Sequence, residues 1–226
     1  MDGGERVDRR RRTLLAADLG VKAGVLALLA LALAFPDWER FAGKAMAGRA
    51  VAYPLALLVV PLGHLAARRR ALARRGVPSR YPVGADLLFG LPWLVDLAGN
   101  AVDAFDRVGW FDDAAHLLNW ALLTGALVAV LPRDLPRWVA VLLATGTGCL
   151  AALGWELAEY ATFIRGGAEE ATAYRDTLGD MSLGTLGALL SAAVGTGLRR
   201  AGWRGTGLRG ERSPVPAGTG SLRRRP

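Results

Sequence analysis

The chain has 226 residues, of which 52% are hydrophobic and only 21% are charged, and its mean hydropathy is +0.27. Soluble domains are usually less apolar and more charged, and the apolar residues here form long blocks, so the composition argues against a soluble protein and indicates a multi-pass membrane protein. The net charge of +8 could suit nucleic acid. The arginines, however, cluster between the apolar blocks, which is typical of membrane topology, so we expect membrane lipids and no nucleic acid as partners.

The two termini and the single cysteine further limit the kinds of protein that fit this sequence. Residues 1–13 and 199–226 are polar and arginine-rich, and we expect both tails to be disordered. The first apolar block is long for a signal peptide and lacks a convincing cleavage site, so we interpret it as an uncleaved span. Cys149 can form no intrachain disulfide, and the sequence contains no cysteine metal motif.

Six apolar blocks predict an all-α membrane domain over residues 14–198, with six transmembrane helices. Pro54 and Pro61 lie within the second block and should kink it. Near the inner end of the first block, Asp18 and Lys22 are four residues apart and can pair, or Lys22 can extend towards the interface. The predicted spans are 14–35, 50–67, 82–101, 113–131, 137–164 and 177–198.

The orientation follows from the positive charges. Of the 28 Lys and Arg residues, 21 fall in the two tails and alternate loops, six fall in the other loops, and Lys22 lies within a span. Loops rich in Lys and Arg stay on the cytoplasmic side. The sequence therefore predicts an inner-membrane protein with both termini in the cytoplasm.

The predicted outer ends of the spans carry polar side chains. Glu156 and Glu159 close the fifth span and share one helix face, as do Asp112 and His116 at the start of the fourth. At 1.5 Å per residue these groups lie within roughly 12 Å of the outer surface. Ionisable groups at such depth turn towards the protein interior. The other polar residues at this depth are Asp96, Asn100, Asp113, Asn119, Asp176 and Asp180.

Several carboxylates in one layer must be protonated or neutralised by a cation. Arg107, Arg165 and Arg175 in the outer loops are the candidate basic partners. The alternative is a divalent metal ion, since helix-borne carboxylates and histidines at these spacings build metal sites in helical bundles. The sequence predicts His116, Glu156, Glu159 and Asp180 as ligands of such an ion, all within reach of one another. A structural interpretation remains open, in which Asp180 caps its helix and His116 pairs with Asp112.

The spacing of these residues resembles a known pattern. Asp112-x-x-x-His116, Trp155-Glu156-x-x-Glu159 and Asp176-Thr177-x-x-Asp180 together resemble the bacterial YjdF-type inner-membrane proteins and, more loosely, the VanZ-like family. The resemblance covers about residues 85–198. It implies a small multi-pass membrane protein and supplies no reaction. Either Asp112 or Asp113 could match the first position of the pattern.

Three hypotheses about function follow. In the first, the polar layer is a metal-dependent hydrolase or transferase site for a lipid-linked or envelope substrate, with Asp112 or Asp176 as general base on a metal-bound water. In the second, the carboxylates carry protons or cations in transport or binding. In the third, the protein is purely structural. Sparse polar groups in the inner half and the lack of a clear repeat argue against transport. Gly187, Ser191 and Gly195 predict close packing of the sixth span in the middle of the bundle.

Overall fold

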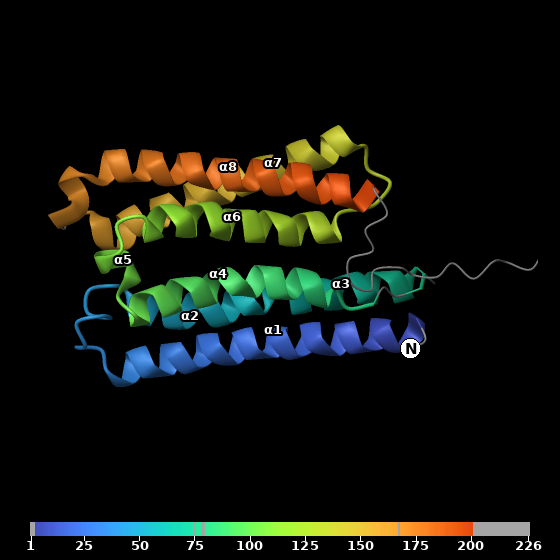
Figure 1. Ribbon diagram of the computed structural model, residues 1–226, viewed down its shortest axis with the longest axis horizontal. Helices are drawn as coiled ribbons and strands as arrows, with labels where there is room; N and C mark the ends of the chain where they lie inside the picture. Colours follow the sequence, from blue (N-terminus) through green and yellow to red (C-terminus); the bar gives the residue numbers. More distant parts are fainter. Residues whose placement is uncertain (1–2, 75, 78–79, 167, 201–226) are drawn as a thin grey trace, which may run out of the picture.

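The computed structural model describes residues 3–74, 76–77, 80–166 and 168–200, and within them every regular element is helical. Long helices lie side by side in an elongated bundle (Figure 1). The long helices are joined by short loops, with α5 and two short helical turns, η1 and η2, near one end. The elements are α1 (Gly3–Ala34), α2 (Met46–Leu57), α3 (Val59–Ala73), α4 (Val83–Ala101), α5 (Ala104–Arg107), α6 (Phe111–Val130), α7 (Arg137–Glu159), η1 (Tyr160–Ile164), η2 (Ala168–Ala171) and α8 (Ala173–Arg200).

Five helical segments of the described chain are long and apolar enough to cross a membrane: α1, α2 with α3, α6, α7 and α8. This confirms the all-helical class. The predicted third span forms α4, which is not among the five. Its aspartates and Asn100 lower its hydropathy, but α4 packs between α1 and α6, so it meets protein on two sides. The count of six spans and the cytoplasmic termini therefore remain predictions.

The helices pack in an order that differs in one respect from the prediction. α1 and α2 pack on α4, α4 packs on α6, and α8 packs on α6 and α7. Figure 1 shows α1 at one edge of the bundle and α8 towards the other, with α4 and α6 between them. The prediction that the sixth span occupies the middle of the bundle is therefore wrong. α8 nevertheless has helix neighbours on two sides, α6 and α7, because small residues allow close packing whether or not a helix is central.

The interface between α6 and α8 is the tightest in the bundle. A Cβ atom at Gly187 would overlap the backbone carbonyl of Leu117, and one at Gly184 would lie 2.7 Å from the indole of Trp120. Glycine at both positions lets the two helix axes approach closely. The start of α8 is thereby held against the start of α6, where the predicted polar residues lie.

The remaining differences concern the first two spans and the tails. α1 begins at Gly3, so the arginine-rich segment that was expected to be disordered continues the helix; arginine is a good helix former. The second span is interrupted at Leu58, because Pro61 lacks an N–H and its ring crowds the carbonyl of Leu57. Pro54 lies inside α2 without interrupting it. The predicted C-terminal tail lies outside the described residues beyond α8.

Candidate functional site

A cavity of about 430 Å³ lies where α4 ends and α6 begins, at the predicted outer end of the bundle. It is lined by residues of α4, α6, α7 and α8, as the sequence predicts for spans three to six, and also by α2, which the sequence did not implicate. The predicted site residues that line it are Asp112, His116, Glu159, Asp176 and Asp180.

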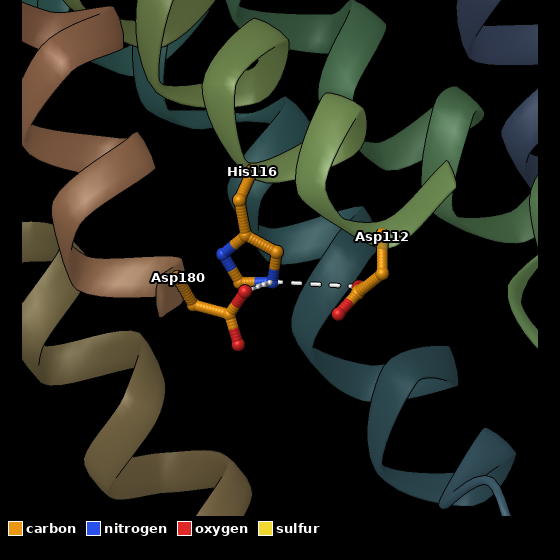
Figure 2. A group of neighbouring side chains, drawn as sticks. All are labelled: Asp112, His116 and Asp180. Atoms are coloured by element: carbon orange, nitrogen blue, oxygen red, sulfur yellow. Dashed lines mark ion pairs between the residues drawn. The ribbon is translucent and has the colours of Figure 1, made fainter. Parts of the chain in front are cut away.

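His116 stands at the centre of the acidic side of this cavity. Its Nε2 lies 3.6 Å from Asp112 Oδ1 and 3.8 Å from Asp180 Oδ1. Figure 2 shows the imidazole between these two carboxylates, one from its own helix and one from α8. Its Nδ1 lies 3.6 Å from Glu156 Oε1 on α7. Three helices thus bring carboxylates to one imidazole, as the sequence predicted from depth and helix face.

The spacing of these atoms is wide for hydrogen bonds and suits an ion between them. Ligand atoms of Asp112, His116 and Asp180 all lie within 4.8 Å of one another, and so do those of His116, Glu156 and Glu159. Two ligands at roughly 2.1 Å from a tetrahedral ion are separated by about 3.4 Å. Small side-chain adjustments would therefore place either set around a metal ion, and the two sets share His116.

Two atoms of the second set are buried without partners. Within the described residues, His116 Nδ1 and Glu156 Oε1 have no hydrogen-bond partner, although Glu156 is only 3% exposed. Buried polar atoms are nearly always hydrogen-bonded, and these two face each other at 3.6 Å. A shift of a few tenths of an ångström would form an N–H···O bond between them.

The two neighbouring aspartates of α6, Asp112 and Asp113, have different environments. Asp112 lines the cavity, whereas Asp113 is exposed and does not line it. Of the two aspartates, Asp112 is therefore the one that faces the cavity. Asp176 lines the cavity from the first turn of α8, one turn before Asp180.

The opposite side of the cavity holds cations that sequence analysis missed. Arg49 on α2 pairs with Asp96 on α4 at 3.0 Å, and the Tyr53 hydroxyl donates to the same carboxylate at 2.6 Å. Lys44 bonds Asp106, and this hydrogen bond lowers the pKa of Asp106. The sequence could have identified Arg49 as a partner of Asp96, since an arginine at the start of an apolar span lies at the same depth in the membrane as Asp96.

The basic residues that the sequence proposed instead are placed differently. Arg107 pairs with Asp103 of its own loop at 2.6 Å and is largely exposed. Arg165 and Arg175 are exposed and do not line the cavity. The compensation expected from the outer loops therefore comes mainly from Arg49 and Lys44, which lie on the α2 side.

A second polar cluster lies at the other end of α4. Lys22 pairs with Asp18 at 2.8 Å, as predicted, and also with Asp86, whose carboxylate accepts the Tyr81 hydroxyl as well. Both aspartates are 2% exposed or less. Burial and the bond to Asp86 raise the pKa of Tyr81. The predicted interfacial His64 packs edge-on against Tyr81. This cluster joins α1 to α4 through polar contacts.

Comparison with known proteins identifies a family for the chain. Residues 21–201 match the family described as "Predicted membrane protein (DUF2238)", and the chain belongs to this family. No curated protein and no solved structure matches it. The family and the long apolar helices establish a multi-pass membrane protein. The match carries neither the YjdF-type nor the VanZ-like name, so that resemblance remains a prediction.

Proposed function

We propose that this protein is a metal-dependent membrane hydrolase or transferase whose reaction centre is the acidic side of the cavity. The observation that carries the proposal is the position of His116 Nε2, which faces the carboxylates of Asp112 and Asp180 in the cavity wall. Three protein ligands with a fourth position open to solvent or substrate are the arrangement of catalytic metal sites.

In this proposal Glu156 orients the histidine and is not itself a ligand. An imidazole that binds a metal through one nitrogen usually donates its other N–H to a carboxylate, which fixes the tautomer and the ring. Nδ1 faces Glu156, which is absent from the cavity wall, whereas Nε2 faces the cavity side. We therefore assign Asp112, His116 and Asp180 as ligands, with Asp112 as a ligand and not a base.

The remaining carboxylates of the cavity supply the proton transfers. Glu159 and Asp176 line the cavity without belonging to this ligand set, so either can act as the general base for an attacking water or hydroxyl. A bound divalent ion would polarise the electrophile and stabilise developing negative charge. Two carboxylates with one imidazole suit Zn²⁺ or Mn²⁺. The position of the cavity at the predicted membrane surface favours a lipid-linked or envelope substrate.

Metal analysis of the purified full-length protein tests the proposal. The wild type, Asp180→Asn and Asp113→Asn proteins would be stripped with chelator in detergent and reloaded with Zn²⁺ or Mn²⁺. Elemental analysis would then give the metal content per chain. Asp113 is a matched control, because it belongs to the same layer but is exposed outside the cavity. We expect about one ion per chain in the wild type and the control, and a loss of most of it in Asp180→Asn. Equal metal content in all three proteins would refute the assignment.

The alternative, a protein that binds or transports protons or cations, predicts a different pattern. Transport would require the inner cluster of Asp18, Lys22 and Asp86 to act together with the cavity. The three groups are instead satisfied mainly by one another and by Tyr81. A purely structural role predicts no metal dependence, and the same analysis separates it from the proposal.

A further inference from the structure

The cavity is much larger than a metal site requires. Its volume of about 430 Å³ falls in the range of pockets for small organic ligands, whereas one ion and its water occupy only a small part. The side chains away from His116 therefore describe what else binds there.

The charges of the cavity wall favour a cationic ligand group. Lys44 and Arg49 line the cavity, and each is already engaged with a carboxylate, Asp106 and Asp96 respectively. Four further carboxylates line it, from Asp112, Glu159, Asp176 and Asp180. Within the ion pairs of the described chain, none of these four is joined to a lysine or arginine, although the charge of Arg49 acts on Glu159 from farther away. One divalent ion balances at most two of the four charges, so the carboxylates away from the ion favour a cationic group over a neutral or anionic one.

An aromatic wall lies beside these carboxylates. Trp93 and Trp155 line the cavity from α4 and α7, and Tyr53 of α2, which is only 1% exposed, supports them from the core. The Tyr53 and Trp93 rings are 4.9 Å apart between centroids, and the Trp93 and Trp155 rings are 6.3 Å apart. Aromatic faces together with carboxylates are how proteins recognise alkylammonium groups.

We infer that the cavity binds the headgroup of a zwitterionic, amine-bearing phospholipid from the outer leaflet. The ammonium group is held by the aromatic wall and by carboxylates that do not bind the metal, such as Glu159. The phosphodiester and ester oxygens would lie on the His116 side of the cavity, where the divalent ion would bind. This inference rests on the proposed function, since it names the substrate class of the same site, but the amine preference comes from different residues.

Calorimetric titration of the full-length protein in detergent tests this inference. The probes are dihexanoyl phosphatidylethanolamine and dihexanoyl phosphatidylglycerol, which share chains and phosphodiester and differ in the ammonium group. We expect the amine lipid to bind at least tenfold more tightly, since cation–π contacts in desolvated sites contribute up to about 2 kcal/mol. The preference should persist after chelator treatment. If the protein binds no metal but still prefers the amine lipid, the metal proposal fails and the lipid inference stands. If it binds metal but shows no preference, only the lipid inference fails.

Variants assign the preference to the aromatic wall. Trp93→Leu should reduce the ratio of the two affinities at least fivefold, while Trp138→Leu should leave it unchanged, because Trp138 is 67% exposed and does not line the cavity. Glu159→Gln provides a second test with little change in side-chain volume if Trp93→Leu does not fold. Equal binding of the two lipids by the wild type, or an unchanged ratio in the folded cavity variants, would overturn the inference.

Discussion

The substitution Glu156→Gln tests most directly whether Glu156 orients His116 while Asp112 and Asp180 bind the metal. Glutamine keeps the size of the side chain and an acceptor oxygen, but it removes the negative charge that faces Nδ1. Hydrogen bonds to charged groups contribute about 1.5–3 kcal/mol and neutral ones about 0.5–1.5 kcal/mol. The lost difference of roughly 1–1.5 kcal/mol corresponds to about tenfold weaker metal binding. This agrees with the lower end of the 10–100-fold losses typical of residues that orient a metal-binding histidine.

The affinity would be measured by competition with a chromophoric chelator for Zn²⁺ and Mn²⁺, beside Asp180→Asn and Asp113→Asn. A second measurement uses the metal-free protein, which has two histidines, His64 and His116. With ¹⁵N-labelled histidine, NMR reports which ring nitrogen carries the proton, and a His64→Gln background leaves His116 alone. Glu156 should favour the tautomer with the proton on Nδ1, and Glu156→Gln should shift the population towards the other tautomer.

The outcomes discriminate between three roles of Glu156. A loss of metal affinity as large as that in Asp180→Asn would make Glu156 a direct ligand, as the sequence predicted, and would refute the orienting role. Unchanged affinity and an unchanged tautomer would show that Glu156 is only a structural neighbour. A tenfold loss together with a tautomer shift is the result that the geometry predicts.

Three further predictions concern the fold. Gly187→Leu should destabilise the protein by about 3 kcal/mol or more in thermal unfolding in detergent, because the new side chain would overlap the Leu117 carbonyl. The control Leu198→Ala, at a residue that is 40% exposed, should cost under about 1 kcal/mol. Equal effects of the two substitutions would argue against the close α6–α8 contact. Arg49→Leu should cost roughly 1–3 kcal/mol, because Asp96, whose side chain is 14% exposed, loses its cation. The double variant with Asp96→Asn should recover most of that loss; no recovery would mean that the ion pair is not the cause. Reporter fusions after Arg75 and after Arg165 should report opposite sides of the membrane, the first cytoplasmic; the same side for both would disprove the six-span topology.

The class of the protein and the composition of the polar layer were evident from local sequence properties. Hydropathy over a span and the distribution of arginine depend only on the chain itself, so they indicate a membrane bundle without knowledge of neighbours. Depth along a helix and the helical repeat are local too. They were sufficient to predict that His116, Glu156 and Asp180 would meet at one end of the bundle, in agreement with distances of 3.6 Å from His116 to Glu156 and 3.8 Å to Asp180.

The partners within that layer were decided only by tertiary packing. Which nitrogen of His116 faces which carboxylate depends on the crossing of α6, α7 and α8, and glycine contacts such as that of Gly187 set how closely α8 approaches α6. Asp112 rather than Asp113 lines the cavity, because only one of two adjacent helical residues can point inward. The pairing of Arg49 with Asp96 joins two spans that are far apart in the sequence. Periodicity shows that a side chain turns inward, but the side chain that it meets depends on which helices are neighbours.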